Sequence, residues 1–343
     1  MHERGNAIQV VLAVYDPSGT YSRHAGVVMT SLFSNTQSRI DVTILHDTTL
    51  TGDNRRRFER TAKRWQQRVS FIDVSEYILK VFSDPDKEGR RFSRGALFRL
   101  LIPDLLAVPK VVYLDCDVVV NMDIEELWNV PVDNAFLAAV RSLQTNVTRD
   151  ITFREKIRTW IIGCRPDLQF CSGVLLMNLE RIRGKYDFLQ EAYRYFKRYG
   201  HVSDCADEDF LFTLLHEETL LIDTRFDCFS GGGDIDNRIV HFIGDPKPWK
   251  APQKIPEHFL YWKVFMESEW KDQFCDALVE VFKGKPLEHY RSLECIRLLL
   301  RRIPGHLRLD RCYDFCKKAG IIFKELYLSC FVYRKQGSEK SGN

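Results

Sequence analysis

Two carboxylates interrupt an otherwise apolar segment, VVYLDCDVVV at residues 111–120. The other eight residues are of the kind that fills a strand covered on both faces, and an unpaired buried carboxylate there would be costly. At the end of such a strand, Asp115 and Asp117 can turn toward one point and share a divalent cation. Oxygen ligands suit Mg²⁺ or Mn²⁺, which keeps part of its shell for phosphate oxygens. By itself, however, the pair also fits two exposed aspartates at a strand end.

A second segment, HFIGDPKPW at residues 241–249, carries complementary chemistry. The neutral imidazole of His241 can complete a metal shell, and Gly244 allows a close backbone approach. Lys247 can meet a diphosphate, and the prolines on either side of it stiffen its loop. Together with the paired aspartates, these residues predict a site for a metal ion and a nucleotide diphosphate.

The elements that must position these residues follow from apolar periodicity. Strands are predicted at residues 8–15, 41–46, 69–74, 110–120, 171–179 and 239–243, and helices around residues 28–33, 54–67, 95–106, 186–199 and 207–216. Their alternation favours a mostly parallel sheet with helices on both faces. Ligands of such sheets bind beyond the carboxyl ends of the strands, where the aspartates are expected. Residues 84–91 and the glycines at 231–233 are predicted loops.

Composition and charge constrain the class of protein. The chain has 343 residues and a formal net charge of +3, but residues 286–343 hold twelve Lys and Arg against six Asp and Glu. This basic segment suits a helix on an anionic membrane, an ordinary helical cap with a solvated basic face, or nucleic-acid binding, although no nucleic-acid module is recognisable in it. The ten cysteines lack paired metal spacing and are expected to be reduced thiols. Neither a signal peptide nor a membrane-spanning segment is evident, which predicts a cytoplasmic protein.

Five segments in order resemble glycosyltransferase family 8. They are SRGALFRLLIPDLL, VVYLDCDVVV, FCSGVLLMNL, CADEDFLF and HFIGDPKPW. That family includes lipopolysaccharide α-galactosyl- and α-glucosyltransferases and, more distantly, glycogenin. The resemblance extends from about Ile8 to Lys250. It implies an α/β fold of the GT-A type, a Rossmann-like α/β/α sandwich with a mostly parallel sheet. We expect a catalytic domain at residues 1–270 and a basic helical extension at residues 271–343.

The resemblance also implies roles for individual residues. Asp115, Asp117 and His241 match the metal ligands, with Mn²⁺ or Mg²⁺ bound alongside a UDP-sugar. Lys247 and the Gly244 backbone would hold the diphosphate. The remaining matches are Arg99, Asp207 and Glu208 near the donor sugar, and Ala13, Val14 and Tyr15 at the strand end where uridine would lie. Taken alone, Arg99 fits a solvated helix charge, and residues 207–209 fit an acidic run at a helix N-terminus.

Two positions depart from the family pattern. Cys171 stands where relatives usually have asparagine, and Glu208 stands where they often have glutamine. The first departure puts sugar preference in doubt, and the second supplies a carboxylate able to attack C1. Retention of configuration, which the family implies, is reached by front-face displacement or by double displacement through an enzyme carboxylate. We favour the front-face route, because relatives tend to have an amide at the position of Glu208.

The expected function is therefore metal-dependent, retaining transfer of a hexose, glucose or galactose, from a UDP-sugar to a saccharide acceptor. The acceptor is expected to be lipopolysaccharide core or another lipid-linked glycan, with peripheral contact at the inner face of the membrane and no nucleic-acid partner. One alternative is a phosphatase of the haloacid dehalogenase type, whose DxD normally opens the domain, whereas about three βα units precede it here. The other is a non-catalytic protein that binds a nucleotide sugar.

Overall fold

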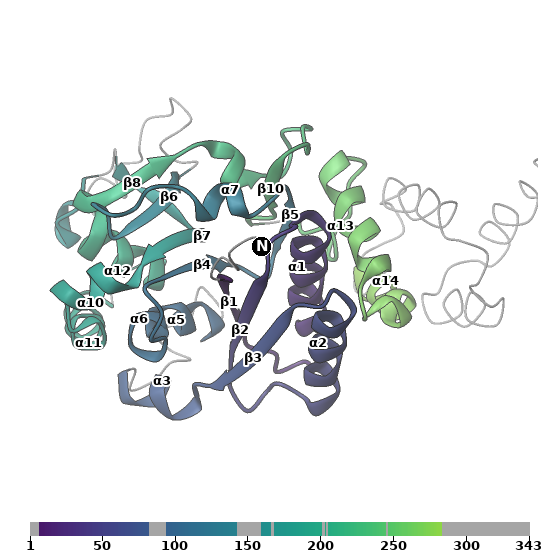
Figure 1. Cartoon of the computed structure of the whole chain (residues 1–343), viewed down its shortest axis with the longest axis horizontal. Coiled ribbons are helices and arrows are strands. Elements are labelled where there is room, and N and C mark those ends of the chain that lie inside the picture. Colours follow the sequence, from purple (N-terminus) through teal and green to yellow (C-terminus); the bar gives the residue numbers. More distant parts are fainter. Residues whose placement is uncertain are drawn as a thin grey trace, which may run out of the picture. The chain divides into compact units, whose positions relative to one another are not determined.

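A computed structural model of the chain describes residues 7–81, 94–142, 159–165, 168–200, 203, 205–244 and 246–282 (Figure 1). The chain divides into two compact units. The first contains the chain as far as Cys228 together with residues 235–241, and the second contains residues 229–234 and the chain from Phe242 onward. The paired aspartates and His241 belong to the first unit, so their geometry is defined within one body.

A seven-stranded sheet organises the first unit, with strand order β3-β2-β1-β4-β7-β6-β8. Its strands are β1 (Ile8–Val14), β2 (Ile40–His46), β3 (Arg68–Asp73), β4 (Lys110–Leu114), β6 (Leu137–Arg141), β7 (Phe170–Asn178) and β8 (Thr219–Ile222). The pairs β1–β2, β2–β3, β1–β4 and β6–β8 are parallel, whereas β7 runs antiparallel to β4 and β6. The prediction of a mostly parallel sheet is confirmed.

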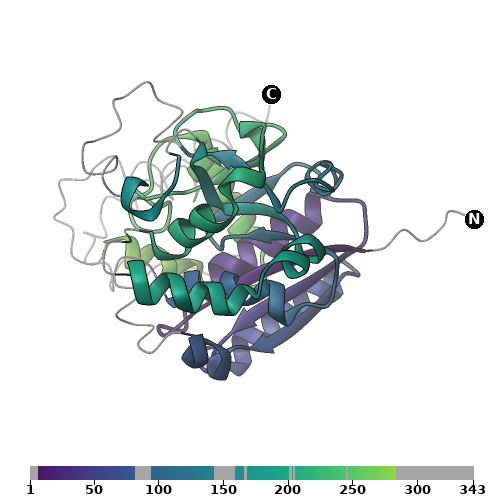
Figure 2. The ribbon, with the colours of Figure 1, turned by 90° about the vertical axis from the view of Figure 1, so that its left-hand side faces the viewer.

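Helices cover both faces of this sheet (Figure 1). Those of the first unit are α1 (Ser22–Asn35), α2 (Gly52–Arg64), α3 (Ser75–Val81), α5 (Arg94–Phe98), α6 (Ile102–Leu105), α7 (Glu125–Trp128), α10 (Leu179–Lys185), α11 (Phe188–Tyr199) and α12 (Ala206–Leu215), with 3-10 turns η1 (Arg99–Leu101), η3 (His216–Glu218) and η4 (Thr224–Phe226). Figure 1 shows α1 and α2 on one side of the strands and α5, α6 and α10 to α12 on the other. Figure 2 turns the side of the teal helices α10 to α12 toward the viewer.

The core on the α5 and α12 side follows from strand alternation. Val11 and Ala13 of β1, together with Val111 and Tyr113 of β4, join one buried cluster with residues of α5, α11 and α12. The intervening residues of β1 are also buried, at less than 2 % exposure. Because both faces of each central strand are covered, the strands read as continuous apolar runs. Polar side chains that these strands carry therefore collect at their ends.

The segment at residues 110–120 forms two strands rather than the single predicted one. β4 ends at Leu114, and β5 (Val118–Asn121) belongs to a second sheet of order β5-β10-β9, with β10 (Arg238–His241) and β9 (Cys228–Phe229). The prediction was wrong because apolar periodicity cannot tell one long strand from two that pair with different partners. A last core strand was predicted at residues 239–243. The structure instead has β10 of this smaller sheet there, and β10 ends at His241.

The predicted helix at residues 95–106 is also interrupted. α5 passes into η1 and then into α6, which has Pro103 in its first turn. The other predicted elements are found within a few residues of their expected bounds.

The predicted loop at residues 84–91 and the basic segment 286–343 lie outside the described residues. None of the described helices is long and apolar enough to cross a membrane, and the six described cysteines are thiols.

The second unit is built around aromatic side chains of α13 (Pro256–Glu267), followed by η5 (Lys271–Gln273) and α14 (Phe274–Phe282). Tyr261 packs against Trp249 with ring centroids 5.0 Å apart, and Trp262 packs against Phe274 at 5.5 Å. The carboxylate of Glu257 accepts hydrogen bonds of 2.8 Å from the backbone N–H groups of Gly231 and Gly233. This buried acid therefore fixes the predicted glycine loop.

Candidate active site

Strand pairing brings the two aspartates and His241 together. β4 ends immediately before Asp115, and β5 begins immediately after Asp117. We call residues 115–117, between these two strands, the aspartate turn. Because β10 is antiparallel to β5, with His241 opposite Val118, the end of β10 lies beside this turn. Nε2 of His241 is 3.2 Å from Oδ1 of Asp117 and 4.0 Å from Oδ2 of Asp115. These three side chains each present one ligand atom within 4.8 Å of the others.

The two oxygens of Asp115 have different surroundings. Oδ1 accepts hydrogen bonds from Nη2 of Arg99 at 2.6 Å and from the hydroxyl of Tyr113 at 2.7 Å. Oδ2 is the oxygen nearer to His241. Burial, together with the charge of Asp117, raises the pKa of Asp115 to about 6 against the opposing effect of Arg99. Two partly buried carboxylates this close disfavour each other's ionisation, so the pair favours positive charge beside it, as Arg99 supplies at Oδ1 of Asp115.

Arg99 links Asp115 to a third carboxylate. Its Nε lies 3.0 Å from Oδ2 of Asp207, and it also donates to the carbonyl oxygen of Ser172. The guanidinium stacks over the ring of Tyr113 at 4.6 Å and is only 4 % exposed. Burial by itself would lower the pKa of Arg99, but Asp115 and the other anionic neighbours hold it well above its usual value. Arg99 is therefore a permanent buried cation, not a solvated helix charge.

Glu208 stands next to Asp207 at the start of α12. Its Oε2 accepts from the backbone N–H of Ser172 at 3.2 Å and from the Ser172 hydroxyl at 3.3 Å. Burial, with a further contribution from the charges of Asp207 and Asp209, raises the pKa of Glu208 to about 7. Around neutral pH this carboxyl group is therefore divided between its acid and its base form. The antiparallel direction of β7 matters here, because it brings Ser172, near the start of that strand, to the end of β4.

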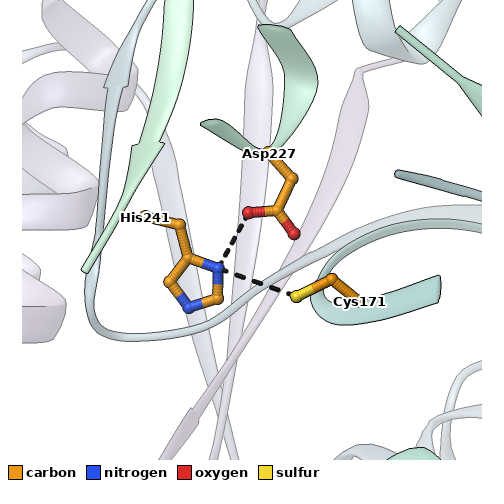
Figure 3. Close-up of side chains that lie close together, drawn as sticks. All are labelled: Cys171, Asp227 and His241. Atoms are coloured by element: carbon orange, nitrogen blue, oxygen red, sulfur yellow. Dashed lines mark hydrogen bonds and ion pairs between the residues drawn. The ribbon is translucent and has the colours of Figure 1, made fainter. Parts of the chain in front are cut away.

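The Nδ1 side of the His241 ring faces residues that the sequence analysis did not identify as a group. Its Nδ1 lies 2.8 Å from Oδ1 of Asp227 and 4.0 Å from the sulfur of Cys171 (Figure 3). Burial lowers the pKa of His241, but the carboxylates of Asp227 and Asp117 outweigh this and raise it well above the usual value. Burial raises the pKa of the Cys171 thiol well above its usual value, so the sulfur is neutral. Asp227 lies between η4 and β9, outside every predicted motif.

The remaining predicted site residues are found at two places. Ala13 and Val14 are buried at the end of β1, where the carbonyl of Ala13 accepts a hydrogen bond of 3.1 Å from the Cys116 thiol, and Tyr15 follows them. Gly244 and Lys247 belong to the second unit. Gly244 has a φ of 66°, which favours glycine, and Nζ of Lys247 donates to the carbonyl oxygen of Phe242.

The residues at the aspartate turn fit a hard divalent cation. They offer carboxylate oxygens and one imidazole nitrogen, which is a donor set suited to Mn²⁺ or Mg²⁺. The orientation of His241 supports the same fit, since Nδ1 faces a carboxylate while Nε2 faces the paired aspartates. The carboxylates of Asp227 and Asp117, which lie at the two ring nitrogens, raise the pKa of His241 against the effect of its burial.

Fold and site together define the class of GT-A glycosyltransferases. The family model described as glycosyl transferase family 8 matches residues 13–252, and the chain belongs to this family. It is similar to general stress protein A of Bacillus subtilis, at 23% identity over 73% of this chain and 91% of that protein. The lipopolysaccharide 1,2-glucosyltransferase of Escherichia coli also shows 23% identity, over 78% of this chain and 81% of that protein.

A solved structure shows the same fold. The galactosyltransferase LgtC, in complex with donor and acceptor sugar analogues, superimposes with a TM-score of 0.64 at 19% identity. The superposition covers 78% of this chain and all of LgtC. The expected family and fold are thereby confirmed, and nothing in these comparisons supports the phosphatase alternative.

Proposed function

We propose that the protein is a metal-dependent, retaining hexosyltransferase that uses a UDP-sugar, with glucose or galactose as the transferred hexose. The observation that carries the proposal is the convergence of Asp115, Asp117 and His241 at the edge of the sheet, beside the buried ion pairs of Arg99. The glucosyltransferase of Escherichia coli and LgtC support the choice of these two hexoses, because their names state transfer of them.

Asp115, through Oδ2, with Asp117 and Nε2 of His241 would hold Mn²⁺ or Mg²⁺. Such an ion supplies positive charge that stabilises the diphosphate as it leaves. Arg99 and Tyr113 occupy Oδ1 of Asp115, which leaves Oδ2 directed toward His241. Lys247 and the Gly244 backbone are proposed to add charge and an N–H group at the diphosphate. Residues 13–15 are proposed to line the uridine pocket.

Arg99, Asp207 and Glu208 are proposed to face the donor sugar. Arg99 forms ion pairs with both Asp207 and Asp115. Asp207, which would bind sugar hydroxyls, is thereby linked through Arg99 to Asp115, a proposed metal ligand. Glu208 is held by Ser172 on the neighbouring strand. We favour front-face displacement, in which the departing phosphate helps to remove the acceptor proton and Glu208 orients the sugar. Double displacement would instead use Glu208 as the nucleophile.

The acceptor is proposed to be a saccharide, and lipopolysaccharide core or another lipid-linked glycan fits the glucosyltransferase relative. The basic residues beyond Pro286 would then contact the anionic inner face of the membrane. Co-sedimentation with anionic and neutral vesicles, with and without the segment after Pro286, tests this contact. Binding that is indifferent both to anionic lipid and to truncation would contradict it.

The first test of the proposed function is UDP release from a panel of UDP-sugars, with Mn²⁺ or with chelator and without added acceptor. Water often serves as a poor acceptor, so Mn²⁺-dependent release from one sugar would identify the donor. Mn²⁺-dependent binding of UDP without release would favour a strict acceptor requirement or a non-catalytic binding protein. If the protein neither releases nor binds UDP, the proposed function is wrong.

A further inference from the structure

His241 is held by a carboxylate on the side opposite the proposed metal. Oδ1 of Asp227 lies 2.8 Å from Nδ1 of the imidazole. A carboxylate can only accept a hydrogen bond, so Nδ1 must carry the proton of this pair. Nε2 then points toward Asp117, at 3.2 Å from its Oδ1 (Figure 3 shows the Asp227 side of the ring). The choice of ring nitrogen, and with it the metal-facing atom, is therefore set by Asp227.

Burial of the Asp227 carboxylate is energetically unfavourable at this position. Its side chain is 0 % exposed, and its Oδ2 has no hydrogen-bond partner among the residues that the structure describes. Burying a carboxylate with one unsatisfied oxygen is unfavourable unless a cationic or strongly polar partner compensates for it. Within the described part of the first unit, the hydrogen-bond partner of this carboxylate is His241. If this position served packing alone, an apolar side chain of similar volume would stabilise the fold more.

The ring of His241 also packs directly against the backbone of Gly173. A Cβ added to Gly173 would lie 2.0 Å from Cε1 and 2.7 Å from Nδ1 of His241, far inside any normal contact. Glycine in the middle of β7 is otherwise unfavourable for a buried strand, so the close approach of the imidazole explains it. Cys171, two residues earlier on the same strand, stands 4.0 Å from Nδ1. Gly173 leaves space for the ring, and Asp227 fixes which edge faces the aspartates.

We propose that Asp227 is a positioning residue that holds His241 with Nδ1–H donated to it and Nε2 presented to the metal beside Asp115 and Asp117. It would act through His241 and would not touch the substrate. The proposal rests on the proposed metal-dependent function. Carboxylates that orient a metal-binding histidine typically contribute 10- to 100-fold to metal affinity.

Two measurements on the full chain test the proposal. The first is NMR of ¹⁵N-histidine-labelled protein, metal-free and with diamagnetic Mg²⁺, in which a His241→Gln spectrum identifies the signal among the nine histidines. The wild type is expected to show an Nδ1–H proton shifted downfield by its carboxylate partner. The second is Mn²⁺ affinity by calorimetry, for which Asp227→Asn is expected to lose about 10- to 100-fold.

Two further variants separate positioning from a general loss of packing. Asp209→Asn is the matched control, because Asp209 is also buried but holds Ser203 and the N–H of Cys205 instead of His241. It is expected to leave both the Mn²⁺ affinity and the Nδ1–H signal of His241 unchanged. Gly173→Ala keeps Asp227 and displaces the ring, so it is expected to weaken Mn²⁺ binding and to move the Nδ1–H signal.

The outcomes also distinguish this proposal from the proposed function. If Asp227→Asn lowers the thermal stability but the folded protein binds Mn²⁺ as the wild type does, Asp227 is merely structural and the proposal is overturned. It is also overturned if the wild type lacks a carboxylate-bonded Nδ1–H. A wild type that shows this proton but does not bind Mn²⁺ would contradict the metal-dependent function and leave the orientation of His241 established.

Discussion

At the scale of single residues, the site depends on the two carboxylates not being equivalent. Oδ1 of Asp115 is already used by Arg99 and Tyr113, whereas Asp117 approaches Nε2 of His241. Arg99 therefore offsets part of the charge of Asp115, whereas Asp117 lies beside the imidazole of His241. The two aspartates are therefore separated by one residue and yet have different partners.

Asp117→Asn is predicted to abolish transfer and to weaken Mn²⁺-dependent UDP binding, because an amide oxygen is a neutral and poorer ligand for a hard cation. Calorimetry with Mn²⁺, with and without UDP, measures the effect. Asp123→Asn is a suitable control, since Asp123 accepts from the N–H of Glu125 beyond β5. Unchanged Mn²⁺ affinity in the Asp117 variant would remove this aspartate from the metal site.

Glu208→Gln is predicted to keep substantial transfer activity, since front-face displacement needs no enzyme nucleophile. The pKa of Glu208 is about 7, so a nucleophilic role would make the rate rise with pH through that value. The kcat and KM of both proteins, measured from pH 5.5 to 8.5, decide between the routes. Loss of nearly all turnover in the variant, with UDP-sugar binding intact, would favour double displacement.

Sequence patterns indicated which residues of the site carry charge, but not all of their partners. The aspartates, His241, Arg99, Asp207 and Glu208 stand in motifs that resemble a known family, and the structure brings these six residues together in the first unit. The role of Asp227 could not be predicted from the sequence, because it lies in an irregular segment. Its role depends on a contact with His241, which is 14 residues away in the sequence. Gly173 was quoted within a motif, yet its role depends on the neighbouring ring.

At the scale of elements, the start of α1 is organised by one buried acid. Asp16 accepts hydrogen bonds from the backbone N–H groups of Tyr21 and Ser22, at 2.7 and 2.9 Å, and from the Ser22 hydroxyl at 2.6 Å. Asn54 of α2 donates to the same carboxylate at 3.2 Å. Asp16 therefore satisfies helix N–H groups that have no partner in the helix and connects α1 to α2.

Asp16→Ala is predicted to lower the free energy of unfolding by about 1–3 kcal/mol, because it leaves several buried donors without a partner. Denaturant unfolding followed by circular dichroism gives the value. Asp53→Ala serves as the control, since Asp53 lies in the first turn of α2 but is largely exposed and pairs with Arg57 at the surface. Equal effects of the two substitutions would argue against a special role for Asp16.

The order of elements could be predicted from the sequence, but their pairing could not. Apolar runs identified β1 to β4 and β7, since buried strands and their turn residues leave a clear pattern. The short strands β6 and β8 were not predicted, because a strand of four or five residues has too little periodicity. The break after Asp117 was missed for a different reason: Val118 and its neighbours are as apolar as β4, but they pair with β10 instead.

At the scale of the whole molecule, the buried carboxyl groups make stability depend on pH. The folded pKa of Glu208, about 7, is above its usual value of 4.5, so the folded protein retains this proton where the unfolded chain has lost it. The stabilisation from that proton is complete below pH 4.5 and is lost as the pH rises through about 7. Asp115, with a folded pKa of about 6, acts in the same direction.

Glu208→Gln is therefore predicted to stabilise the metal-free protein at pH 8 relative to the wild type, by about 1–3 kcal/mol more than at pH 5. Denaturant unfolding of both proteins at the two pH values, in the presence of chelator, provides the comparison. The variant shares all other titrating groups, so the contributions of those that do not interact with Glu208 cancel in the difference. A difference in stability that does not change with pH would show that burial of the Glu208 charge has no net cost.

The pairing of β5 with β10 also has a consequence for folding. Asn121 and Ile235, which are joined by a hydrogen bond at one end of this pair, are separated by 114 residues. The parallel strands β1 to β3 join much nearer segments, and contacts between distant segments generally form slowly because a long loop must close first. In a refolding experiment, strand signals should therefore recover before His241 reaches the aspartates. Uptake of Mn²⁺ at the proposed metal site would then report one of the last steps of folding.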